Sequence, residues 1–159
     1  MSKKPPLQNQ GFKWWEHVTE IWAVATNIYI EGTFPNGVQY DMASAIQLMH
    51  NMMVAHAKAV IAYKKQAMKK IGIVHSLESK YPYDETKDED VKAAKNEDVL
   101  NNQFLLDATF LGEYRDETME IINRLVELNN GSFHASKDDM EILKEAAYWY
   151  REVSKTKEL

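Results

Sequence analysis

The feature that most constrains the fold is residues 41–70, a long stretch without proline or glycine that runs directly into a β-prone segment. Its apolar positions recur at steps of three and four residues and lysines gather at its end, which predicts an amphipathic helix. Asp41 or Tyr40 lies where the N-cap residue would be. Residues 71–74, Ile-Gly-Ile-Val, predict one buried strand. A helix that runs into a strand is typical of an α/β fold, so we expect this class.

Three further helices are predicted after that strand. Residues 88–111 are helical in pattern, with acidic residues at their start. Residues 116–130 are amphipathic and stop at an Asn-Asn-Gly sequence. Residues 136–153 predict a last helix, in which Ser136 and Asp139 have the spacing of a capping box. The expected architecture is therefore helix-rich, with few short strands.

The N-terminal part of the chain has a less regular pattern. Residues 1–13 are polar and contain two prolines, which predicts a flexible arm. Residues 12–30 form an aromatic and β-branched run whose periodicity does not distinguish a strand from a helix. Glycine, proline and asparagine residues then predict a loop at residues 31–39.

The composition disfavours several functional classes. The formal charge of −5 and the pI near 5.6 disfavour nucleic acid as a partner, because its binders need a dense positive surface. Without cysteine, the chain can form neither a disulfide framework nor a thiolate metal site. No apolar stretch has the length of a signal-peptide core or a membrane span, so we expect no membrane association and a cytoplasmic location.

The residues that could carry metal or nucleotide chemistry lack the required spacing. His50 and His56 are too far apart for a helical metal site, so hydrogen-bonded structural roles are the preferred interpretation. Glycine-rich phosphate loops and a Gly-x-Ser-x-Gly elbow are absent from the sequence, which disfavours nucleotide binding and serine hydrolysis. Met49, Met52 and Met53 could form an adaptable binding surface, but methionine at helical spacing is more often part of the core.

Seven contiguous sequence segments resemble segments of a known family. They share a fixed order and spacing, and they occupy residues 32–41, 50–60, 71–76, 80–84, 90–94, 104–109 and 112–114. Together they resemble the phosphoglycosidases of glycoside hydrolase family 1, nearest the 6-phospho-β-galactosidases. The similarity covers about residues 14–145 and is strongest from 32 to 131.

The resemblance implies a partial TIM (β/α)8 barrel, its middle portion around strands four to six. We therefore expect residues 14–147 to form the barrel segment, residues 1–13 an arm, and residues 148–159 a helical or frayed tail. A complete barrel takes about 250 residues. We therefore expect the segment to be too incomplete to hydrolyse a glycoside alone.

The resemblance also implies the site residues. In the family, a tryptophan introduces a strand-four motif that ends in Asn-Glu, whose glutamate is the general acid/base; Trp15 and Glu20 take these positions. Thr19 replaces the asparagine that contacts the sugar 2-hydroxyl, and its shorter side chain cannot supply the same contact. The family's strand-seven nucleophile and phosphate loop have no counterpart here, and no metal or cofactor is implied. His75 and Tyr81, just past a predicted strand, are candidate cleft neighbours, with structural roles as the alternative.

The implied function is that of a truncated or split 6-phospho-β-galactosidase, a hydrolase of phosphorylated β-galactosides. The implied partners are such a glycoside, if a site is completed, and a second copy or complementing fragment that covers exposed strand edges. The alternative is a non-catalytic helical interaction or assembly protein derived from the barrel segment. The threonine at position 19 and the missing strands favour that alternative.

Overall fold

The computed structural model describes residues 14–35, 37–66 and 70–155, and only the backbone of residues 14–19, 70 and 152–155. The arm predicted for residues 1–13 lies outside this part of the chain. Within the described residues, no helix is both long enough and apolar enough to cross a membrane.

The sheet consists of two short parallel strands, β1 (Trp14–Thr19) and β2 (Lys70–Val74). Trp15 pairs with Ile71 and Thr19 with Val74, with a register irregularity between Glu16 and Thr19. Parallel strands need a long crossover connection. Here the crossover runs through α1 (Ile21–Ala25), the π-helical turn η2 (Thr26–Ile30) and α2 (Met42–Gln66). The run at residues 12–30, whose type the sequence left open, thus contains a strand followed by helical turns.

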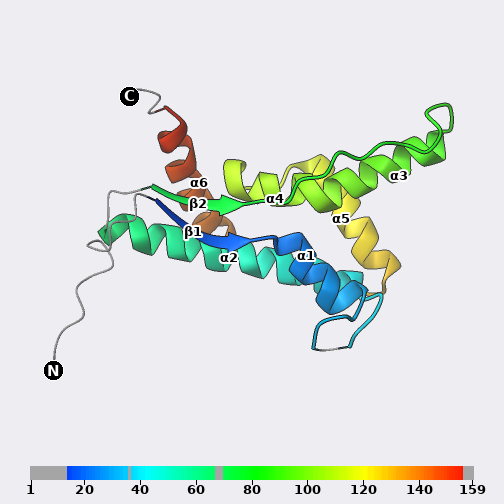
Figure 1. Ribbon diagram of the computed structural model, residues 1–159, viewed down its shortest axis with the longest axis horizontal. Helices are drawn as coiled ribbons and strands as arrows, with labels where there is room; N and C mark the ends of the chain where they lie inside the picture. Colours follow the sequence, from blue (N-terminus) through cyan, green and yellow to red (C-terminus); the bar gives the residue numbers. More distant parts are fainter. Residues whose placement is uncertain (1–13, 36, 67–69, 156–159) are drawn as a thin grey trace.

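Helix α2 supplies many of the buried core residues and runs beneath the two strands in Figure 1. It runs alongside the strands and packs against β1, α1, α5 and α6. Met49 is fully buried and Met53 is 2% exposed, which confirms that these methionines are core residues. The core-facing positions of α2 recur at helical spacing, and they are Ala45, Ile46, Met49, His50, Met53, Val54, His56, Ala57, Val60 and Ile61.

The three helical regions predicted after β2 are confirmed. The first comprises α3 (Asp88–Asp98), η3 (Val99–Gln103), α4 (Phe104–Leu106) and η4 (Asp107–Leu111) in unbroken succession. It is followed by α5 (Asp116–Leu128) and α6 (Lys137–Lys155). The boundary expected between residues 147 and 148 therefore falls inside α6.

The helix caps agree with the sequence pattern. The Asp41 carboxylate accepts a hydrogen bond from the backbone N–H of Ser44 at 2.9 Å, so Asp41 caps α2. The Ser136 hydroxyl accepts from the N–H of Asp139 at 3.1 Å, and the Asp139 carboxylate accepts from the N–H of Ser136 at 3.1 Å. These two bonds form the predicted capping box.

Two helix ends differ from the sequence expectation. Lys70 was expected in the helix that begins at Asp41, but it lies in β2, where it pairs with Trp14. Asn129 and Asn130 lie beyond the end of α5. The backbone N–H groups of Asn129 and Asn130 still bond to carbonyls in the last turn of α5, at 3.1 and 3.0 Å. The Asn129 side chain donates to the carbonyl of Tyr40 at 2.9 Å and accepts from the N–H of Ala43 at 3.3 Å, which links the end of α5 to the start of α2.

Candidate active site

Glu20 lies between β1 and α1, at the carboxyl end of the strand. Its backbone is left-handed, with φ 53° and ψ 42°, which is uncommon for a residue with a side chain. The side chain is exposed and makes no capping hydrogen bond to α1. The Glu20 carboxylate therefore does not serve as the N-cap acceptor of this helix. Such a backbone outlier at a strand end is typical of functional positions.

Trp15 and Thr19, the other two site residues that the resemblance implies, lie within β1. Thr19 immediately precedes Glu20 in the sequence. The two residues that the resemblance assigns to the Asn-Glu pair are therefore adjacent at the end of β1.

Glu20 and His75 follow directly after the two paired strands. Because β1 and β2 are parallel and Thr19 pairs with Val74, both residues lie at the same edge of the sheet. In barrels of this class, catalytic residues come from the carboxyl ends of the strands. The carboxyl edge is therefore the candidate active site of this chain.

The His75 side chain has a structural partner. Its Nε2 lies 2.8 Å from the Thr109 hydroxyl, and that hydroxyl donates to the carbonyl of Leu105 at 2.8 Å. The hydroxyl oxygen therefore accepts from Nε2–H, which leaves Nδ1 as a buried acceptor without a partner among the described residues. Burial lowers the pKa of His75, which favours the neutral ring. This arrangement supports the structural alternative for His75.

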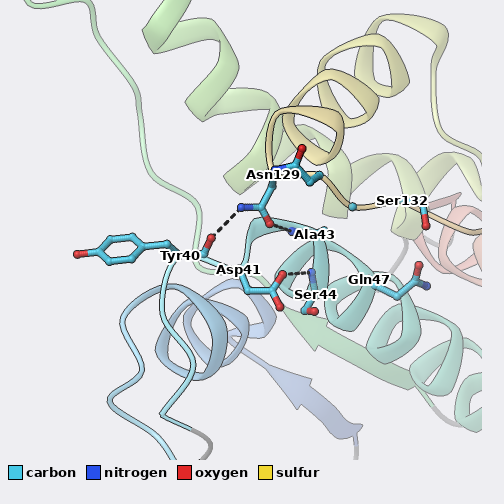
Figure 2. Close-up of a pocket in the computed structure, with 9 residues that line it drawn as sticks. Tyr40, Asp41, Ala43, Ser44, Gln47, Asn129 and Ser132 are labelled. Atoms are coloured by element: carbon cyan, nitrogen blue, oxygen red, sulfur yellow. Dashed lines mark hydrogen bonds between the residues drawn. The ribbon is translucent and has the colours of Figure 1, made fainter.

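Another hollow lies beside the start of α2. It has a volume of about 550 Å³ and is lined by residues at the start of α2 and by residues 129–132, which follow α5. Figure 2 shows Asn129 bonded to both Tyr40 and Ala43, while the Tyr40 ring points away from the hollow. Glu20 is not among its lining residues, so this hollow is not part of the candidate active site.

The two histidines on α2 are structural, as the sequence predicted. His50 Nδ1 lies 2.8 Å from the hydroxyl of Tyr114, and His56 hydrogen-bonds through Nε2 to the hydroxyl of Tyr150. In the part of the chain that the structure describes, no group of three or more histidine, aspartate or glutamate side chains could hold a metal ion.

Tyr81 is 80% exposed and lines a second hollow, beside α3. Sequence reasoning did not single out the α3 residues of this hollow, which are Asp90, Ala93, Ala94 and Glu97. Their spacing of three, four and seven residues places them on one helix face, and this pattern was available in the sequence.

Comparison with known sequences identifies relatives for most of the chain. The model of the family described as Glycosyl hydrolase family 1 matches residues 8–147. The chain is 46% identical over 135 residues to a 6-phospho-beta-galactosidase of Staphylococcus epidermidis. It is 44% identical over 134 residues to a protein of the same name from Staphylococcus haemolyticus. The matches cover 84% of this chain, which spans 29% of the length of each relative.

Comparison with solved structures finds the same family fold. A beta-glucosidase from Exiguobacterium marinum is similar with a TM-score of 0.69 and 27% identity, over 83% of this chain and 30% of that chain. The beta-glucosidase BglU from Micrococcus antarcticus gives a TM-score of 0.70 and 25% identity, over 82% of this chain and 27% of that chain. These similarities do not favour the alternative of a non-catalytic assembly protein. They confirm the resemblance found in the sequence, and the chain belongs to glycosyl hydrolase family 1.

Proposed function

We propose that this chain carries the acid/base part of a retaining 6-phospho-β-galactosidase site, with β1 as strand four and β2 as strand five of a (β/α)8 barrel. The observation that carries the proposal is the placement of Glu20, which is exposed, uncapped and at the carboxyl end of β1. The names of the two staphylococcal relatives supply the substrate class, a phosphorylated β-galactoside.

In this proposal Glu20 acts twice. It first donates a proton to the glycosidic oxygen, so that the leaving group departs as a neutral alcohol. It then removes a proton from the water that hydrolyses the glycosyl-enzyme intermediate. Trp15 and Thr19 contribute to the sugar-binding wall, with the threonine supplying a weaker contact than the family's asparagine.

A second carboxylate, about 5 Å from the first, must attack the anomeric carbon in a retaining glycosidase. By the family resemblance it comes from strand seven, which the matched segment does not include. Among the described residues each strand pairs with one neighbour, so the outer edges of β1 and β2 are where further barrel strands would pair. We expect the purified chain by itself to give no hydrolysis above the buffer blank.

The decisive experiment grafts this segment into a complete barrel. Residues 14–147 replace the aligned part of the Staphylococcus epidermidis relative, and hydrolysis of a nitrophenyl β-galactoside 6-phosphate is measured. We expect the graft to be active and Glu20→Gln to lower its turnover by about 100-fold or more. The matched control is Glu31→Gln, the same change at an exposed glutamate in the loop after η2, which should leave turnover unchanged.

A second readout identifies the role of Glu20. Azide is a nucleophile that needs no general base, so it should restore turnover in the Glu20→Gln graft when the leaving group is a nitrophenol. A folded graft whose activity is insensitive to Glu20→Gln would contradict the proposal. Hydrolysis by the purified chain that disappears in Glu20→Gln would contradict the need for a strand-seven carboxylate.

A further inference from the structure

The loop between β2 and α3 holds two tyrosines out into solvent. Tyr81 is 80% exposed and Tyr83 is 98% exposed. Large aromatic side chains gain free energy from burial, so two neighbouring rings exposed to this degree mark a contact surface. Both line the hollow beside α3, which has a volume of about 480 Å³. This volume lies within the range of about 300–1,000 Å³ that is usual for small-molecule sites.

The loop is anchored to the helices at its start. The side chain of Asn102, which is 7% exposed, donates to the carbonyl of Glu78 at 2.7 Å and accepts from the N–H of Glu78 at 3.2 Å. This pair of bonds fixes the chain against η3 just before the two tyrosines. Figure 1 shows the loop running beside the α3 to α4 region to one end of the molecule.

The loop is also anchored just after the tyrosines. The Asp84 carboxylate accepts from the N–H of Thr86 at 3.0 Å and from its hydroxyl at 2.7 Å. The N–H of Asp84 donates to the carboxylate of Asp90 on α3 at 3.0 Å. With both ends fixed, the backbone that carries the two tyrosines is preorganised, and a ligand does not need to order the loop when it binds.

The α3 face of the hollow carries two small side chains and two carboxylates. Ala93 and Ala94 are small and leave room between α3 and the tyrosines. Asp90 and Glu97 flank them, and each carries a carboxylate that can accept hydrogen bonds from hydroxyl groups. Lys80 also lines the hollow, and its ammonium is paired with the Glu78 carboxylate at 2.7 Å, so the two carboxylates of Asp90 and Glu97 outweigh its positive charge.

We propose that this hollow binds the pyranose ring of a neutral saccharide. The negative face of an aromatic ring attracts the C–H groups of one sugar face, which suits Tyr81 and Tyr83. The hydroxyls at the sugar edge suit the carboxylates of Asp90 and Glu97. The same carboxylates repel a phosphate group, so the hollow selects a neutral sugar over a phosphorylated one.

The hollow is distinct from the candidate active site, because Glu20 is not among its lining residues. The loop nevertheless leaves the sheet at the carboxyl edge of β2, the edge at which Glu20 lies. The proposal does not depend on the proposed hydrolase function, since it requires no second carboxylate and no bond cleavage.

The test is a titration of the ¹⁵N-labelled full chain with lactose, with cellobiose and with galactose 6-phosphate, followed by amide chemical shifts. We expect lactose or cellobiose to shift amides of residues 79–97 with a dissociation constant on the order of 1 mM. The double variant Tyr81→Ala/Tyr83→Ala should bind at least about tenfold more weakly. Glu97→Gln, which removes one acceptor charge from an exposed position, should also weaken binding.

The matched control is Tyr40→Ala, which removes a tyrosine that is 78% exposed but does not line this hollow. It should leave saccharide binding unchanged, and circular dichroism of each variant checks that it is folded. The proposal is overturned if neither neutral sugar shifts these amides, or if the double tyrosine variant binds as tightly as the parent chain. Galactose 6-phosphate binding in the hollow as tightly as lactose would also overturn it.

Discussion

His50 Nδ1 lies 2.8 Å from the hydroxyl oxygen of Tyr114, and this contact ties the middle of α2 to the segment before α5. The Tyr114 ring in turn stacks on Phe104, with centroids 4.5 Å apart. The Asp139 carboxylate lies 3.7 Å from Nε2, which favours the tautomer with its proton on Nε2 and Nδ1 as the acceptor of the Tyr114 hydroxyl. Burial of His50 holds its pKa below the usual value, although Asp139 acts in the opposite direction.

The first prediction concerns pH. The unfolded chain binds a proton at His50 with a pKa of about 6.5, whereas the folded protein binds it less readily because its pKa is lowered. Protonation therefore favours unfolding, and the free energy of unfolding should fall as the pH decreases below about 6.5. The lowered pKa of the partly buried His75 contributes in the same direction.

Urea unfolding midpoints between about pH 8 and about pH 5.5 measure this effect. A His50→Gln variant should show a flatter profile, because it removes the group whose pKa differs between the folded and unfolded states. Unfolding midpoints that stay constant or rise toward acid would contradict the prediction.

The second prediction concerns Asp107, which is 2% exposed. Its carboxylate accepts from the Arg115 side chain at 2.8 Å, from the Arg115 N–H at 3.2 Å and from the Thr118 hydroxyl at 2.7 Å. Asp107→Ala leaves these donors without an acceptor, so the free energy of unfolding should fall by about 3 kcal/mol in a denaturant titration. Glu120→Ala, at an exposed position on α5, should change it by less than about 0.5 kcal/mol. Similar losses in both variants would show that the network does not stabilise this turn.

The third prediction compares two glycines with positive φ. Gly112, at φ 72°, ends η4, and a Cβ there would lie 2.5 Å from the Cα of Lys144 in α6. At Gly37, with φ 65°, a Cβ would meet no described atom within 4 Å apart from its chain neighbours. Gly37→Ala should therefore cost about 1 kcal/mol for the backbone conformation alone, and Gly112→Ala more than about 2 kcal/mol because α6 must also move. Thermal unfolding of both variants measures the difference, and equal melting temperatures would refute the packing argument.

The fourth prediction concerns Thr19 and uses the barrel graft. Thr19→Asn restores the amide that the family places against the sugar 2-hydroxyl. A hydrogen bond to this hydroxyl strengthens in the transition state of glycoside hydrolysis, so kcat/KM should rise by about tenfold or more. Thr33→Asn, in the loop after η2, is the control and should have no effect. A graft in which Thr19→Asn leaves kcat/KM unchanged would place the sugar contact elsewhere.

The local patterns of the sequence were sufficient for most of the helices. Asp41 and the Ser136–Asp139 pair act on backbone groups within three residues of them, so their capping roles follow from spacing alone. The apolar spacing in α2 likewise predicted the burial of Met49 and Met53. Family membership also came from sequence, because the ordered strings between residues 32 and 131 form one specific pattern.

The tertiary structure decided what depends on contacts between distant residues. The apolar run at residues 12–30 divides into a strand and helical turns because β1 pairs with β2, more than fifty positions away. Lys70 joins that strand for the same reason. The hollow beside α3 forms because Asn102 and Asp90 hold the loop that carries Tyr81 and Tyr83 against the helices. The sequence around these tyrosines contains no pattern that predicts their exposure. Sequence determines caps and periodicity through short-range bonds, whereas strand pairing and cavities arise only when remote segments meet and exclude water.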